Sequence, residues 1–119
     1  MALTVNTRRW GNVAIIELSG RITLGESTGI LRDEIRSLLS QGTKNIILDM
    51  GGVGYVDSAG LGELVGAYTT AANQGGAVKL LRLQGKMIDL MQVTKLHTIF
   101  AIFDDEKQAV ESFGATATA

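Results

Sequence analysis

The spacing of apolar residues along the chain alternates between strand-like and helix-like segments. Five segments carry short alternating or continuous apolar runs that are typical of strands, at residues 3–10, 13–18, 46–48, 77–83 and 99–103. The first two are separated only by Gly11 and Asn12, a pair that favours a tight hairpin turn. The pattern therefore predicts an antiparallel hairpin at the start of the chain.

Four further segments place apolar residues three and four positions apart, as on one face of a helix. They are residues 26–40, residues 58–74, residues 86–95 and a last segment that opens at 104–106 and ends near 113. Since single helices separate the later strands, those strands are expected to lie parallel, joined by right-handed crossovers.

This order of elements predicts a single α/β domain over residues 1–119. Its sheet is expected to be mixed and mostly parallel, with about five strands, about four helices and an N-terminal antiparallel hairpin. Residues 114–119 are small and polar and are expected to fray.

The most informative stretch is residues 45–72, where a strand, a glycine-rich segment, a serine and a helix follow one another. The three glycines within residues 51–54 are expected to form a loop with unusual backbone angles, and a second loop is expected at residues 19–25. Asp57 and Ser58 then open the helical pattern. Backbone N–H groups and a small hydroxyl would meet at this helix start, which makes it the candidate functional site.

Charge and composition narrow the range of functions. The formal net charge is −1 without a basic stripe or acidic tail, which argues against nucleic-acid binding and against electrostatic docking to anionic lipid. The chain has no cysteine, so disulfides, thiolate catalysis and cysteine-ligated metal sites are excluded. The N-terminus lacks the layout of a signal peptide, and no apolar run approaches the roughly eighteen residues that span a membrane. We therefore expect a cytoplasmic protein.

Ser58 can be interpreted in two ways from its position. A serine at a helix start commonly caps the helix, because its hydroxyl accepts a hydrogen bond from a backbone N–H. Here Asp57 can provide that cap instead, which would leave Ser58 at the first helical position. Gly60 and Gly62 lie just behind it, so the surface of a partner could approach the hydroxyl closely.

A small serine hydrolase is a further hypothesis. Residues 56–60 resemble the G-x-S-x-G nucleophile elbow, with valine in place of the first glycine. The only histidine, His97, and Asp89 would have to complete a catalytic triad. The fold that normally carries this elbow is far longer than this chain, which argues against the hypothesis.

Cofactor and metal sites find little support in the sequence. The glycines of residues 51–54 are not followed by the Lys-Ser or Lys-Thr pair of a phosphate-binding P-loop. Asp49, Asp57 and Glu63 are too few and too scattered to indicate a metal site. We therefore expect no cofactor and no metal.

The stretch Asp57-Ser58-Ala59-Gly60-Leu61-Gly62 follows a strand that ends in aspartate, and it resembles the signature of the STAS domain. Specifically, it is similar to that of the bacterial anti-sigma factor antagonists. Residues 18–22 resemble the first turn of this family, and residues 99–104 resemble its last strand and helix start. The likeness covers nearly the whole chain and implies a STAS-like fold for the predicted α/β domain.

The resemblance implies a binding switch rather than an enzyme. In such proteins the motif serine, here Ser58, is phosphorylated by a partner that is both an anti-sigma factor and an ATP-dependent serine kinase. The unphosphorylated form binds that partner and releases a sigma factor, and a metal-dependent serine phosphatase resets the switch. By the same match, the expected partner-binding surface contains Ser58 together with Asp57, Ala59, Gly60, Leu61 and Gly62.

One position departs from the family pattern. The first turn usually ends in a partner-facing aspartate, where this chain has Thr23. Thr23 is included in the expected partner-binding surface, with a hydroxyl in place of the carboxylate. The departure also motivates an alternative hypothesis, a STAS scaffold or sensor subunit of a signalling or lipid-transport complex.

Overall fold

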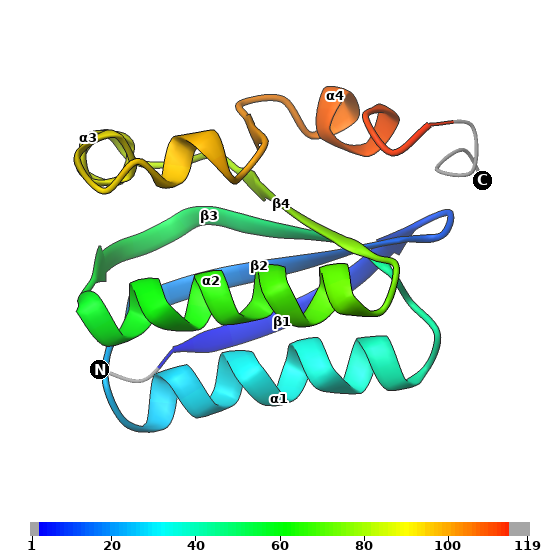
Figure 1. The fold of residues 1–119 in the computed structure, drawn as a ribbon, viewed down its shortest axis with the longest axis horizontal. Helices are drawn as coiled ribbons and strands as arrows, with labels where there is room; N and C mark the ends of the chain where they lie inside the picture. Colours follow the sequence, from blue (N-terminus) through cyan, green and yellow to red (C-terminus); the bar gives the residue numbers. More distant parts are fainter. Residues whose placement is uncertain (1–2, 115–119) are drawn as a thin grey trace.

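The computed structural model describes residues 3–114, which form one sheet with helices packed against it (Figure 1). In chain order the elements are β1 (Thr4–Trp10), β2 (Val13–Ile22), α1 (Glu26–Ser40), β3 (Asn45–Val56), α2 (Ser58–Asn73), β4 (Ala77–Leu81), α3 (Gly85–Val93), the 3-10 helix η1 (Leu96–Thr98), β5 (Ile102–Phe103) and α4 (Glu106–Glu111). This order matches the predicted alternation of strands and helices, with η1 as the one added element.

The five strands lie in the sheet in the order in which they occur along the chain. β1 pairs antiparallel with β2, and the turn between them places Gly11 at φ 62°, a backbone angle that glycine adopts readily. The later pairs, from β2–β3 to β4–β5, are all parallel. The predicted mixed, mostly parallel sheet with an N-terminal hairpin is therefore confirmed.

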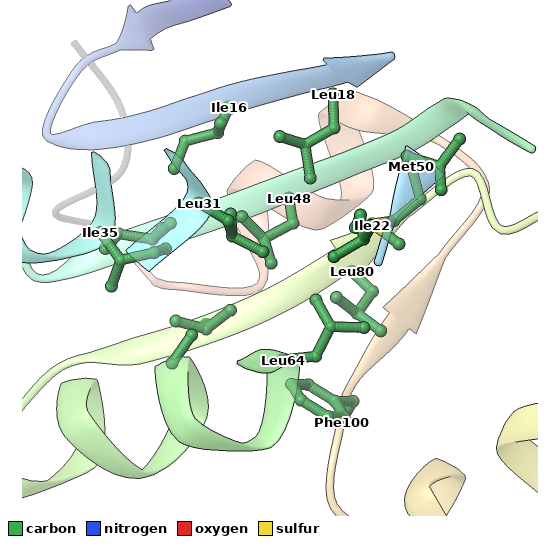
Figure 2. Close-up of a cluster of buried hydrophobic side chains, with 14 of the residues drawn as sticks. Ile16, Leu18, Ile22, Leu31, Ile35, Leu48, Met50, Leu64, Leu80 and Phe100 are labelled. Atoms are coloured by element: carbon green, nitrogen blue, oxygen red, sulfur yellow. The ribbon is translucent and has the colours of Figure 1, made fainter. Parts of the chain in front are cut away.

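One face of the sheet packs against α1 and α2, which lie side by side (Figure 1). Inward-facing side chains of β2, β3 and β4 meet Leu31 and Ile35 of α1 and Leu64 of α2 (Figure 2). Burial of each such side chain stabilises the fold by roughly 2 kcal/mol. This core holds α2, and with it the candidate site at the helix start, in a fixed position on the sheet.

The opposite face of the sheet packs against α4. Ala109 and Val110 of this helix are buried against a smaller cluster that includes Ile15 of β2 and Ile47 of β3. The central strands are thus covered on both faces, which explains why their apolar runs are nearly continuous rather than alternating.

The two segments expected to be loops are instead largely strand. β2 continues through residues 19–22, β3 continues through residues 51–56, and these extensions pair with each other. Gly52 lies so close to β2 that a Cβ atom would sit 2.8 Å from the Leu18 carbonyl oxygen. The glycines therefore allow β2 and β3 to pair closely, with two irregularities in their register. A cluster of glycines in the sequence is equally typical of a loop, so the sequence does not distinguish the two structures.

β4 and β5 are shorter than predicted. β4 ends at Leu81 because Arg82 adopts a left-handed backbone conformation, with φ 59°, which turns the chain out of the sheet. β5 pairs only over the last two residues of β4 and is limited to Ile102–Phe103. Residues 115–119, which were expected to fray, lie outside the described residues. Within residues 3–114, no helix is both long and apolar enough to cross a membrane.

Candidate functional site at the start of α2

The candidate site is built where β2 and β3 end side by side. Ile22 lies opposite Val56 at the carboxyl ends of these parallel strands. The backbone N–H of Asp57 donates a hydrogen bond to the Ile22 carbonyl oxygen at 3.2 Å. The loop after β2 and the start of α2, which are far apart in the sequence, therefore meet at one end of the sheet.

Asp57 joins these two segments with both oxygens of its carboxylate. Oδ1 accepts a hydrogen bond from the Gly60 N–H at 2.8 Å, which caps the start of α2. Oδ2 accepts a hydrogen bond from the Leu24 N–H at 3.0 Å, in the loop after β2. These donors, Leu24 first and Gly60 second, hold the pKa of the Asp57 carboxyl below its usual range, so the group is ionised at neutral pH.

Ser58 is the first residue of α2, and it is exposed. Because Asp57 occupies the capping position, the interpretation of Ser58 as the helix cap is wrong. Among the hydrogen bonds of the described chain, none holds the Ser58 hydroxyl. The hydroxyl is therefore accessible to a macromolecule that approaches this end of the sheet.

The rest of the motif divides into a supporting part and an exposed part. Gly60 is buried, and a Cβ atom there would lie far inside contact distance of a backbone oxygen of β2. Leu61 is half-buried and packs against the core, and Ala59 is also half-buried. Gly62 is exposed with open space around it. Of the predicted binding residues, Ser58 and Gly62 are thus the exposed pair.

The loop after β2 presents a different residue from the one expected. Thr23 is half-buried, and its N–H donates to Ser27 Oγ at 2.8 Å while the Ser27 hydroxyl donates back to the Thr23 carbonyl at 2.8 Å. Leu24 instead has 80% of its surface exposed. Leu24 lies outside the motif, and a single exposed leucine in a loop is too common for the sequence to signal a contact surface there.

A second exposed apolar side chain lies near the end of β3. Tyr55 is 50% exposed, and Arg21, its pairing partner on β2, lies over the ring at 5.3 Å from the centroid. Such cation–π contacts contribute about 0.5–1 kcal/mol at exposed sites and restrict the motion of the ring. We refer to the four exposed residues Leu24, Tyr55, Ser58 and Gly62 as the end face.

The surroundings of Ser58 do not supply the base that a hydrolase needs. His97 belongs to η1, and its Nδ1 lies 3.2 Å from the Met91 carbonyl oxygen. Both oxygens of Asp57 accept hydrogen bonds from backbone N–H groups. Within residues 3–114, no three His, Cys, Asp or Glu side chains lie close enough together to hold a metal ion.

Comparison with known proteins identifies the family. The family model of the STAS domain matches residues 4–109 of this chain. The chain belongs to the STAS-domain family. The match extends from β1 into α4, so it covers the whole sheet as well as the end face, and it confirms the family suggested by the motif from Asp57 to Gly62.

Relatives and solved structures agree with this assignment. The anti-sigma-B factor antagonist of Bacillus subtilis (strain 168) is 31% identical over 102 residues, which cover 86% of this chain and 92% of that protein. The crystal structure of a candidate anti-sigma factor antagonist from Thermotoga maritima superposes with a TM-score of 0.84 at 22% identity, covering 91% and 92% of the two chains. The Bacillus cell fate determinant SpoIIAA in its phosphorylated form superposes with a TM-score of 0.73 at 19% identity, covering 93% and 100%. These two structures confirm the fold.

Proposed function

We propose that this protein is a cytoplasmic anti-sigma factor antagonist whose docking to an anti-sigma factor is switched by phosphorylation of Ser58. The name of the relative at 31% identity supports the first part. The phosphorylated SpoIIAA structure, which shares the fold, supports the second. The proposed partners are an anti-sigma factor with serine kinase activity, which the unphosphorylated form binds so that a sigma factor is released, and a metal-dependent serine phosphatase.

The position of the Ser58 hydroxyl is the observation that carries this proposal. The residue is exposed at the first position of α2, while the neighbouring Asp57 makes the helix cap. A kinase can therefore reach the hydroxyl, and its modification removes no hydrogen bond on which the described fold depends. An exposed serine without a structural role is the kind of residue on which a reversible modification can act.

Phosphorylation is expected to leave the fold nearly unchanged. A phosphate adds roughly −1.5 to −2 charges at pH 7. The positive end of α2 favours this charge by up to about 1 kcal/mol, whereas the ionised carboxylate of Asp57 opposes it. The two effects offset each other, so the free energy of unfolding should change little.

The effect on docking is expected to be much larger. Leu24 and Tyr55 offer the exposed apolar contact area that commonly anchors a protein interface. A phosphate at Ser58 within such an interface would lose water and lie beside the Asp57 carboxylate without a new positive partner. A cost of about 4 kcal/mol corresponds to a thousandfold loss of affinity. Charge at a single residue can therefore switch docking without refolding.

The proposal is tested by mapping the modified residue. The purified protein and its Ser58→Ala variant are incubated with ATP and a purified anti-sigma factor that has serine kinase activity, and the products are analysed by mass spectrometry. One phosphate on Ser58 of the parent protein and none on the variant is the expected result. Modification of a different residue, with Ser58 intact, would contradict the proposal.

A STAS scaffold or sensor subunit is a second candidate function. The observation that favours it is Thr23, which is half-buried beside Ser27 instead of offering a carboxylate at the surface. An anti-sigma kinase that depends on that carboxylate would bind this chain weakly. Co-purification with subunits of a transport or signalling assembly, together with no detectable binding to an anti-sigma kinase, would favour this candidate.

A further inference from the structure

The second half of β3 has a strand neighbour on one side only. β3 runs from Asn45 to Val56, but its pairing with β4 ends at Asp49. Beyond that point β3 continues to pair with β2 on its other side as far as Val56. In a strand, N–H and C=O groups point alternately to the two sides, so the side facing away from β2 carries hydrogen-bonding groups that no strand of the described chain pairs.

The cause of this open edge is the path of the chain after β4. The left-handed conformation of Arg82 turns the backbone away from β3, and Gln84 then starts α3. α3 lies across from the free edge, and together they enclose a groove of about 760 Å³. The groove is lined by Gly51–Val56 on the strand side and by Gln84–Met87 and Leu90 on the helix side.

The floor of the groove suits an extended chain. Residues 51, 52 and 54 are glycines, and a Cβ atom at Gly54 would meet no atom within 4 Å. A backbone could therefore approach the strand edge closely at Gly54, whereas the Asp49 and Arg82 side chains would lie within 3.6 Å of a Cβ atom at Gly51. At Gly51 the edge is already engaged, because the Gln84 side chain donates a hydrogen bond to the Gly51 carbonyl oxygen and the Gly51 N–H donates to Asp49 Oδ1 at 3.0 Å. The backbone groups open to a bound strand therefore lie at residues 52–56. Among the lining residues, Tyr55 is 50% exposed and Leu90 is half-buried, so these two add apolar surface for alternate side chains of a bound strand.

The charge of the groove specifies the occupant further. Lys86 is the one charged residue among the eleven that line it, and it is exposed. β3 carries one carboxylate, Asp49, which lies 3.3 Å from the Arg82 guanidinium and is already paired. Asp57, just beyond the end of β3, accepts backbone N–H groups with both oxygens. The groove therefore favours a negatively charged segment over a positively charged one.

We propose that this groove binds an extended, acidic peptide segment of a partner protein, which adds to the sheet as a strand beside residues 52–56. The five residues of this edge span about 17 Å, so a segment of about five residues fills it. Such binding would take main-chain hydrogen bonds from the strand edge and selectivity from the apolar wall and Lys86. The inference does not depend on phosphorylation of Ser58.

Selection from a library of random eight-residue peptides tests the proposal directly. The library is displayed against the immobilised full-length protein, and the selected peptides are then synthesised and titrated in solution. We expect peptides with apolar residues at alternate positions and at least one Asp or Glu. On binding, the amide hydrogens within residues 52–56 that face the groove should become protected from exchange with solvent. Methylation of alternate peptide nitrogens, which removes strand hydrogen bonds, should weaken binding at least about tenfold.

A pair of variants checks the role of charge. Lys86→Glu should weaken the selected peptides about fivefold or more, because it replaces an attraction by a repulsion. Arg36→Glu makes the same change of charge on the exposed surface of α1, outside the groove, and should alter affinity by less than about twofold.

Several outcomes would overturn the proposal. The first is that no peptide is enriched over a control surface that lacks the protein. The second is enrichment of peptides whose apolar residues have helical rather than alternating spacing. The third is binding that survives both N-methylation of the peptide and the Lys86→Glu substitution. Parallel titration of the Ser58→Ala variant, which should bind the same peptides equally well, keeps this test separate from the phosphorylation test.

Discussion

The Leu24 N–H donates a hydrogen bond to Oδ2 of Asp57 at 3.0 Å, and this bond ties the loop after β2 to the start of α2. The same carboxylate caps α2 through Gly60, so one side chain fixes both the exposed leucine and the exposed serine of the end face. A partner therefore meets a surface that is already arranged before docking, which lowers the entropy cost of binding.

Substitutions of Asp57 should separate its two hydrogen bonds. Asp57→Asn retains an oxygen that can cap α2 but offers no acceptor to the Leu24 N–H, whereas Asp57→Ala loses both bonds. We expect Asp57→Ala to lower Tm by about 5 °C and Asp57→Asn to lower it by less. Thermal denaturation followed by circular dichroism gives both values. Equal losses for the two variants would show that the loop contact contributes nothing beyond the cap.

The pH dependence of the Asp57 contribution follows from the direction of its pKa shift. Leu24 and Gly60 lower the pKa in the folded state, so the contribution is present above the unfolded pKa of about 3.9 and is lost as pH falls through the folded pKa. The difference in Tm between the parent protein and Asp57→Asn should therefore shrink below about pH 3.9. A difference that stays constant from pH 7 to pH 3 would contradict this assignment.

Ser58→Asp should weaken docking while leaving the fold intact. The added carboxylate places negative charge at the modified position, although with less charge than a phosphate. We expect Tm to change by less than about 3 °C, and the affinity for the anti-sigma kinase to fall at least about tenfold. Ser58→Ala is the matched control, and it should bind the kinase with nearly the parent affinity. A large drop in Tm for either variant would assign Ser58 a structural role.

The sequence predicted the parts of the molecule that depend on local signals. Apolar spacing gave the order of strands and helices, and the Gly11-Asn12 pair gave the hairpin. Asp57 was also recognised as an alternative cap for α2, because aspartate before a helical pattern is a common N-terminal signal. The motif placed Ser58 at the helix start, where the structure has it.

The parts that depend on tertiary contacts were not predicted. The glycines of residues 51–54 suggested a loop, but pairing with β2 makes this segment a strand, and no local pattern reveals that pairing. The position of the loop that carries Leu24 depends in part on a hydrogen bond from the Leu24 N–H to the Asp57 carboxylate, 33 positions later in the chain. The open edge of β3 similarly depends on the backbone angle of Arg82, a residue type that gives no hint of a left-handed conformation.

Two glycines of the motif should respond in opposite ways to the same substitution. At Gly60 an added Cβ atom would sit 2.8 Å from Val56 Cγ1 and clash with the Ile22 carbonyl, so Gly60→Ala should cost about 3 kcal/mol of the free energy of unfolding. At Gly62 the position is open, and Gly62→Ala should raise stability by up to about 1 kcal/mol because alanine favours the helix. Urea denaturation measures both. Comparable destabilisation of the two variants would contradict the structural distinction.

Leu24 should matter for docking and not for stability. Because 80% of its surface is exposed, Leu24→Ser should leave Tm within about 2 °C of the parent value. If Leu24 is buried by the partner, affinity should fall about tenfold or more. Val93 at the end of α3 is also 80% exposed, so Val93→Ser is a control matched in exposure. Isothermal titration with the anti-sigma kinase should show a loss for Leu24→Ser alone, and equal losses would rule out the end face as the docking surface.

Glu106 forms a surface network of charges with Arg8 and Arg82, and its substitution should lower the stability of the fold. Its carboxylate accepts from Arg8 Nη1 at 2.9 Å and lies 3.3 Å from Arg82 Nη2, so it connects α4 to β1 and to the turn after β4. Both arginines are more than a third exposed, and solvent screening keeps the contribution small. Glu106→Gln should therefore lower the free energy of unfolding by about 1 kcal/mol at pH 7.

The effect of Glu106→Gln should disappear in acid. The Arg8 guanidinium holds the pKa of the Glu106 carboxyl below its usual range. Its contribution is thus fully present above the unfolded pKa of about 4.3 and is lost as pH falls through the folded pKa. Glu111→Gln is the control, since Glu111 is exposed and its pair with Lys107 is long, at 4.0 Å. Urea denaturation at pH 7 and pH 3 should show a deficit for Glu106→Gln at pH 7 only, and a similar deficit for both variants would show that the network acts as ordinary surface charge.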